Sequence, residues 1–160
     1  MDLVRGDESP NEMIRLSYGM EMALETFYST LKSGTHDPEL QRFYLDMVAL
    51  EQIHKGRLFE LHKEVDSPGQ DLDAFEAAIN TQIMEGGFNL EGFMEKNASF
   101  MKSVKEALNL AMMLETQALD LYLRFSQKCA KAKTKDVLFK LADEEKAHLA
   151  SLGDLLEKRL

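Results

Sequence analysis

Two glutamates, a tyrosine and a histidine in the first half of the chain recur in the same order in the second half. The four pairs are Glu21 and Glu115, Tyr28 and Tyr122, Glu51 and Glu145, and His54 and His148. Each pair is separated by 94 positions, the difference between 115 and 21. A fixed period of this kind indicates a duplicated structural unit. Each half therefore carries one segment with Glu and Tyr and a second segment with Glu-x-x-His.

Helix signals divide the first half into two long helices joined by a short turn. The segment Ser9-Pro10-Asn11-Glu12 reads as a capping box with proline at the first helical position. Asp37-Pro38 is a second start signal. Apolar residues at helical spacing follow both starts, which predicts helices over about 10–33 and 38–65. This helical hairpin would be roughly 36–42 Å long at 1.5 Å per residue.

The second half repeats this plan with less distinct start signals. Apolar periodicity predicts a third long helix over about 100–128 and a fourth over about 134–160. Ser103 and Glu106 form a capping signature that lies inside the expected third helix.

The connection between the halves, residues 67–99, has a different character. It contains Gly86-Gly87 and only short helical patterns, around 72–85 and 90–97. The chain has 3 Pro, 9 Gly and no Trp, a composition that suits helices. We therefore expect one all-α domain over 1–160, a four-helix bundle of two hairpins joined by a long crossover with short helices.

Charge and cysteine content exclude several classes of function. The formal net charge is −9, so nucleic acid and anionic membranes would be repelled. Cys129 is the single cysteine, which excludes an internal disulfide or a four-cysteine metal site and favours a reducing compartment. No apolar run is long enough for a signal peptide or a membrane span. The expected location is the cytoplasm.

The repeated acids and histidines fall near the middle of the expected helices, within their apolar stripes. Several carboxylates buried together would repel one another and lose hydration, so the pattern needs counter-charge. Two divalent cations would supply it. The helix geometry agrees, because residues at i and i+3 project from one face and can direct a carboxylate and an imidazole toward a common point. The predicted metal ligands are Glu21, Glu51, His54, Glu115, Glu145 and His148.

Carboxylates and imidazoles without thiolates suit iron or manganese, and zinc is an alternative. A single Glu-x-x-His segment is usually exposed helix surface, so the prediction depends on the matched repetition. Tyr28 and Tyr122 lie two turns after Glu21 and Glu115, where they either pack in the core or act near the site. Asp46 and Asp120 are candidates for orienting the metal-bound imidazoles.

These residues resemble the ferritin-like di-iron carboxylate proteins, and most closely the rubrerythrin family. The resemblance covers nearly all the chain apart from residues 67–99. It implies that Glu51 and Glu145 bridge two iron ions. It also implies one terminal Glu and one His for each ion, namely Glu21 with His54 and Glu115 with His148.

The chain departs from the usual rubrerythrin pattern at two points. Full-length rubrerythrins carry a four-cysteine rubredoxin domain, whereas this sequence has only Cys129. They also carry an extra acid three residues after the Glu of the third helix, and that position is Ala118 here. The first departure leaves no internal four-cysteine electron-delivery centre, and the second argues against peroxidase activity of the rubrerythrin type.

The resemblance implies an oxidoreductase connected with oxidative stress. Its substrates would be O₂ or H₂O₂, with an external electron donor such as rubredoxin, or Fe(II) itself in a ferroxidase reaction. The alternative is a non-catalytic protein that binds or sequesters metal. The same resemblance implies a homodimer.

Overall fold

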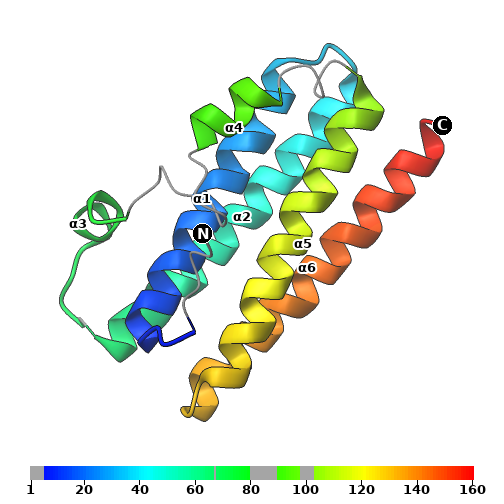
Figure 1. The fold of residues 1–160 in the computed structure, drawn as a ribbon. Coiled ribbons are helices and arrows are strands. Elements are labelled where there is room, and N and C mark those ends of the chain that lie inside the picture. The colour runs from blue at the N-terminus through cyan, green and yellow to red at the C-terminus, as the bar shows by residue number, and fades with distance from the viewer. Residues whose placement is uncertain (1–5, 67, 80–89, 98–102) are drawn as a thin grey trace. The chain divides into compact units, whose positions relative to one another are not determined.

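The computed structural model describes residues 6–66, 68–79, 90–97 and 103–160. Every regular element in these ranges is a helix, which confirms the all-α class and the two long hairpins (Figure 1). The chain forms two compact units, Met1–Leu90 and Glu91–Leu160. The helices are α1 (Pro10–Ser33), α2 (Pro38–Val65), α3 (Leu72–Ala77), α4 (Leu90–Lys96), α5 (Val104–Lys128) and α6 (Ala132–Lys158).

Helices α1 and α2 begin where the capping signals predict. The Ser9 hydroxyl accepts a hydrogen bond from the Glu12 amide, and the Glu12 carboxylate accepts one from the Ser9 amide at 2.8 Å. The Asp37 carboxylate accepts hydrogen bonds from the first amides of α2. These bonds satisfy amides that would otherwise lack a partner at each helix start. A short turn after α1 then brings α2 back along it, and the two helices pack together.

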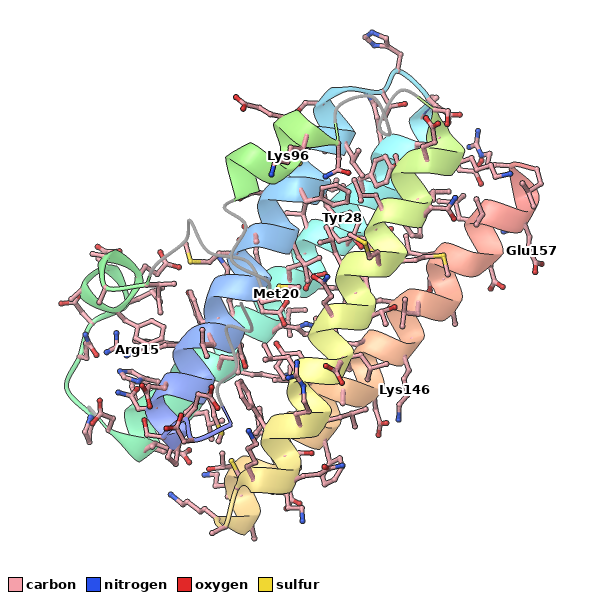
Figure 2. The ribbon with its side chains drawn as sticks, viewed as in Figure 1. Arg15, Met20, Tyr28, Lys96, Lys146 and Glu157 are labelled. Atoms are coloured by element: carbon pink, nitrogen blue, oxygen red, sulfur yellow. The ribbon has the colours of Figure 1, made fainter. Side chains whose placement is uncertain are left out.

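Phe75 anchors the short helix α3 to this hairpin. Its ring is fully buried and meets the Tyr18 ring edge to face, with the centroids 4.9 Å apart. The centroid of the His62 ring lies 4.4 Å from that of Phe75, and the guanidinium of Arg15 lies over the Phe75 ring. Figure 2 shows Arg15 on the side of the hairpin where α3 lies. This aromatic side chain therefore helps to hold α3, whose six residues would be too few to form a stable helix alone.

The third long helix begins later than the expected residue 100. Ser103 has an extended conformation, with ψ at 152°, and its hydroxyl accepts a hydrogen bond from the Glu106 amide. The capping signature thus starts α5 at Val104 and does not lie inside the helix, because the cap residue itself must leave helical geometry. Residue 100 lies outside the described residues.

The fourth long helix begins at Ala132 and ends at Lys158, close to the expected 134–160. The residue before it is Lys131, which is not a capping residue and forms no side-chain cap. The sequence therefore has no clear start signal at this position. Helices α5 and α6 pack together as the second hairpin.

The connection between the hairpins contains the expected short helices. α3 ends at Ala77, before the limit of the 72–85 pattern, and residues 80–85 and Gly86-Gly87 lie outside the described part of the chain. α4 coincides with the 90–97 pattern. In the described residues, no helix combines the length and the apolar character that a bilayer crossing requires.

Candidate metal centre

The first unit buries two glutamates and a histidine on the facing sides of α1 and α2. Glu21 and Glu51 are fully buried, and His54 is 1% exposed. His54 Nδ1 lies 3.5 Å from Oε2 of Glu21 and 3.4 Å from Oε2 of Glu51. One potential ligand atom from each residue lies within 4.8 Å of the other two. We call these three residues the first cluster.

Helix geometry places the first cluster. Glu51 and His54 are one turn apart on α2, so their side chains project from one face. Glu21 comes from the middle of α1, where Leu24 and Phe27 continue the same buried stripe and are themselves fully buried. The apolar packing that joins α1 to α2 therefore also brings the three polar groups together.

The second unit has the same arrangement on α5 and α6. Glu115 and Glu145 are fully buried, and His148 is 4% exposed. His148 Nδ1 lies 3.0 Å from Oε2 of Glu145 and 3.6 Å from Oε2 of Glu115. We call these residues the second cluster. Lys146, the neighbour of Glu145, is exposed and pairs with Asp143 instead (Figure 2).

Burial and mutual repulsion change the proton affinity of the second cluster. Burial raises the pKa of Glu115 to about 8, and Glu145 adds to this effect while His148 opposes it. Burial alone would lower the pKa of His148. Hydrogen bonds to Glu115 and Glu145, together with their negative charge, outweigh that effect and raise the pKa to about 9. Without a metal, protons supply the positive charge that this cluster needs.

The donor atoms of both clusters fit a hard or borderline metal ion. Each cluster offers two carboxylates and one imidazole and no sulfur ligand. Such a set suits iron, manganese or zinc. Each set is also pre-assembled, because the ligand atoms already lie within a few ångströms inside its own hairpin. The residues present therefore fit the metal that the sequence predicts.

The two repeated tyrosines are also completely buried. The Tyr28 ring stacks near that of Tyr44, with the centroids 6.3 Å apart, and packs against Phe27. Tyr122 lies at the corresponding position of α5. Both rings therefore lie in the core, and a role beside the metal remains a prediction.

A polar network beside the first cluster was not predicted from the sequence. Lys55 Nζ lies 2.5 Å from the carboxylate of Glu25, which also accepts a hydrogen bond from Gln52 at 2.9 Å. The Tyr18 hydroxyl donates to Glu76 of α3 at 2.5 Å. Burial and this hydrogen bond raise the pKa of Tyr18. Gln52 and Lys55 are the chain neighbours of Glu51 and His54, so the network joins this segment of α2 to α1. It also reaches α3, because Lys55 Nζ lies 3.8 Å from Glu76.

A buried histidine, His62, has a structural role. Its Nδ1 lies 2.9 Å from Oδ1 of Asn11 and its Nε2 lies 2.7 Å from Oε1 of Gln70. Both contacts tie the end of α2 to neighbouring segments of the first unit. His62 lies two turns after His54 and does not join the first cluster.

The two aspartates proposed to orient imidazoles lie elsewhere. Asp46 is 65% exposed and pairs weakly with Arg42, while Asp120 is 59% exposed and pairs with Arg124 at 2.7 Å. Exposed partners on the helix surface satisfy both carboxylates. Neither aspartate therefore orients a cluster histidine in this structure.

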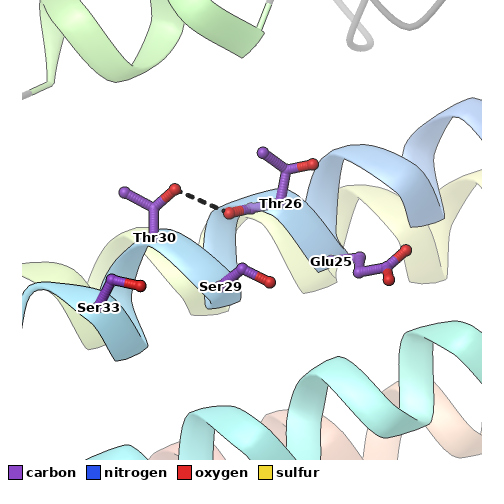
Figure 3. Close-up of a pocket in the computed structure, with 5 residues that line it drawn as sticks. All are labelled: Glu25, Thr26, Ser29, Thr30 and Ser33. Atoms are coloured by element: carbon purple, nitrogen blue, oxygen red, sulfur yellow. Dashed lines mark hydrogen bonds between the residues drawn. The ribbon is translucent and has the colours of Figure 1, made fainter.

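A shallow pocket follows the outer side of α1. Its lining consists of one acid and four hydroxyl side chains, namely Glu25, Thr26, Ser29, Thr30 and Ser33 (Figure 3). The Thr26 and Thr30 hydroxyls donate to carbonyls of their own helix. The pocket contains no residue of either cluster.

Comparisons with known proteins agree with this arrangement. No curated protein matches the sequence. Among solved structures, "CopM in the Cu(II)-bound form" has a similar fold, with a TM-score of 0.68, 6% sequence identity and coverage of 96% of this chain and 99% of that chain. The profile of the family described as Rubrerythrin matches residues 12–156, which contain both clusters. The chain therefore belongs to the rubrerythrin family.

Proposed function

We propose that the two clusters bind a dinuclear iron centre. The observation that carries this proposal is the occurrence of the same buried set, two glutamates and one histidine, in both hairpins of a rubrerythrin-family chain. The expected ligands are those that the repeat predicts: Glu21, Glu51, His54, Glu115, Glu145 and His148. Manganese and zinc are the competing ions, because the same donors accept them.

The protein side chains would perform three tasks at such a centre. Four carboxylates neutralise the metal charge in a buried environment, where an unbalanced ion would be costly. The imidazoles bind as neutral ligands, so His148 has to release its proton when the metal enters. The apolar residues around the clusters limit the access of water to the ligands.

Two iron ions, when bound, supply the two electrons that reduce O₂ or H₂O₂. We propose this oxidoreductase chemistry, with electrons from an external donor such as rubredoxin, as the leading function. Ferrous iron is the alternative substrate, and the reaction would then be that of a ferroxidase. Tyr28 and Tyr122, two turns after Glu21 and Glu115, are the candidates for a role beside the centre in either reaction.

A second candidate, metal binding without turnover, is favoured by one specific observation. Ala118 is fully buried and apolar at the position where the usual family pattern has an additional acid. A methyl group can neither ligate a metal nor exchange with a histidine ligand. The protein therefore lacks, at position 118, an acid that is typical of rubrerythrin peroxidases.

Metal content is the first test of the proposal. The protein would be purified without oxygen and reconstituted in parallel with Fe(II), Mn(II) and Zn(II). Two iron ions per chain would support the dinuclear centre. Failure to retain any metal would overturn it.

Oxidation kinetics then distinguish the functions. Oxidation of the iron-loaded protein by H₂O₂ much faster than by O₂ supports a peroxidase. Rapid oxidation of added Fe(II) by O₂, followed by release of ferric iron, supports a ferroxidase. Stable metal that responds to neither oxidant supports the non-catalytic alternative.

A further inference from the structure

One carboxylate of α1 holds two side chains of α2 that alternate with the predicted ligands. Oε2 of Glu25 lies 2.5 Å from Nζ of Lys55, and Oε1 of Glu25 accepts a hydrogen bond of 2.9 Å from the Gln52 amide. Gln52 directly follows the predicted ligand Glu51, and Lys55 directly follows His54. We call Glu25, Gln52 and Lys55 the clamp, because they join the ligand-bearing segment of α2 to α1.

The clamp lies one turn away from the ligand that α1 contributes. Glu25 comes four residues after Glu21, so the two carboxylates project from nearly the same face of α1. Glu21 lies 3.5 Å from Nδ1 of His54, and Glu25 contacts Lys55, the next residue along α2. The clamp therefore fixes the position of α2 against α1 at the level of the first cluster.

The ammonium group of Lys55 has several partners and little contact with solvent. Its side chain is 15% exposed, and that of Glu25 is 21% exposed. Nζ also lies 3.8 Å from the Glu76 carboxylate of α3 and 5.8 Å from the centre of the Tyr18 ring. Movement away from both acids would leave a largely buried charge without a partner, which is strongly unfavourable. The clamp is therefore more rigid than an ion pair on an exposed helix surface.

The second unit repeats the ligands and does not repeat the clamp. Three different residues occupy the corresponding positions, 94 places later in the chain: Leu119, Lys146 and Leu149. Neither leucine can form an ion pair, and Lys146 pairs with Asp143 of its own helix at 2.9 Å. The ion pair that joins the two helices at this level of the first hairpin thus has no counterpart at these positions of the second.

This difference has a consequence for metal affinity. Ligands that are already held in position lose less conformational freedom when a metal binds, so the site binds more tightly. In the first unit, the clamp restrains the segment of α2 that carries Glu51 and His54. The corresponding segment of α6, which carries Glu145 and His148, lacks that restraint. The first ligand set should therefore have the higher affinity.

We propose that Glu25 is a positioning residue of the first cluster, and that the clamp makes this cluster the half of the metal centre that binds first and more tightly. The inference rests on the proposed metal centre and adds the order in which its two halves are occupied. Glu25 acts through Gln52 and Lys55, which hold both of its carboxylate oxygens. The second cluster then takes up its ion more weakly.

Co(II) binding to variants with a single complete cluster tests the order. Co(II) is a suitable probe because carboxylate and imidazole ligands bind it as they bind iron. His148→Ala leaves only the first cluster complete, and His54→Ala leaves only the second. Competition with a chromophoric chelator should give an affinity about tenfold or more higher for the His148→Ala protein. In the wild type, the same difference should appear as two successive binding steps.

Substitution of the clamp by the residues of the second unit separates positioning from packing. Glu25→Leu combined with Lys55→Leu gives the first unit the leucines of positions 119 and 149. Replacement of a buried ion pair by apolar residues often leaves stability unchanged or increases it, and urea unfolding would verify this. In the His148→Ala protein, the double substitution should lower Co(II) affinity by about tenfold or more. In the His54→Ala protein, it should leave the affinity unchanged.

A conservative variant checks that the ion pair itself is responsible. Lys55→Arg should keep the Co(II) affinity of the His148→Ala protein close to its original value, because a guanidinium also pairs with a carboxylate. Lys55→Met has no charge and should lower that affinity. Equal losses in the two variants would contradict a role for the pair between Lys55 and Glu25.

The possible failures are distinguishable. First-cluster affinity that survives the double leucine substitution, or equal weakening of both clusters, would overturn the positioning role of Glu25 and leave the metal centre in place. Binding of two ions to the wild type in one step of uniform affinity would overturn the order of occupation. Absence of Co(II) binding by the wild type would overturn the metal centre itself, and this inference with it.

Discussion

The Nδ1 atom of His148 lies 3.0 Å from Oε2 of Glu145, one helical turn earlier on α6. This buried pair keeps a proton on the imidazole at neutral pH, because the nearby carboxylates raise the pKa of His148 to about 9. A metal ion has to displace that proton before the ring nitrogen can bind it. The metal-free and metal-loaded proteins should therefore respond to pH in opposite ways.

Metal binding at pH 7 should release protons. Glu115 and His148, with pKa values of about 8 and 9, are both largely protonated at this pH. We expect about two protons to leave the second cluster for each ion bound there. Titration calorimetry with Zn(II) in buffers of different ionisation enthalpy measures this number. An enthalpy that does not depend on the buffer would contradict the expectation.

The metal-free protein should lose stability as the pH rises from about 5 to 9. The pKa of Glu115 rises on folding from 4.5 to about 8, and that of His148 rises from 6.5 to about 9. A raised pKa means that the folded state binds the proton more tightly, so its stabilising contribution is complete at low pH and disappears above the folded value. Urea unfolding at several pH values measures the effect. Glu115→Gln should make the profile flatter, and an identical profile would show that Glu115 does not contribute.

Glu145→Gln should reduce metal binding, because an amide cannot supply the negative charge of the carboxylate. Loss of an outer partner of a ligand already costs about 10–100-fold in affinity, so loss of a direct ligand should cost at least as much. Glu144→Gln is the matched control, since Glu144 is the adjacent residue and is only partly buried. Elemental analysis after dialysis measures both variants. Equal metal content would remove Glu145 from the ligand set.

Phe75→Ala should destabilise the first unit by about 3–5 kcal/mol, the usual cost of removing a buried aromatic ring. The ring contacts Tyr18, His62 and Phe59, so its loss should also release α3. Leu72→Ala provides the control, because Leu72 lies on the same short helix and is 43% exposed. Denaturant unfolding and amide exchange in α3 measure the two effects. Equal stability of the two variants would contradict the anchoring role.

Cys129 should react slowly with thiol reagents in the folded protein. Its side chain is buried, and burial raises the pKa of the thiol, which lowers the fraction of reactive thiolate. A disulfide reagent should modify it at a rate that increases sharply on unfolding. Reaction of the native protein as fast as that of the unfolded chain would show that the site is accessible.

Features of local origin could be predicted from the sequence. The side chains of Ser9 and Asp37 accept hydrogen bonds from amides two or three residues away. The starts of α1 and α2 can therefore be predicted from the local sequence. The spacing of Glu51 and His54 on one helix face follows from helix geometry in the same way. The repeat likewise predicts Glu21 as a ligand together with Glu51 and His54, and Glu21 does lie beside His54 in the structure.

Contacts between distant residues could not be predicted in this way. Tyr18 and Glu76 are 58 positions apart and meet only because α3 folds back onto the hairpin. His62 and Asn11 are 51 positions apart, and they meet because α2 returns along α1. Asp46 and Asp120 failed as imidazole partners because each has an arginine one turn away on its own helix. Each aspartate carboxylate thus pairs with an arginine on its own helix surface and not with a buried imidazole.

The short turn between α1 and α2 has a kinetic consequence. Closing a small loop costs little chain entropy, so contacts within this hairpin should form early when the protein folds. Glu21, Glu51 and His54 all belong to it, and the three ligand groups would meet before α3 has docked. Pulsed hydrogen exchange during refolding should therefore protect α1 and α2 before α3. A nascent chain would then possess a metal-binding element while later parts of it are still unfolded, and iron could guide folding as well as serve the finished protein.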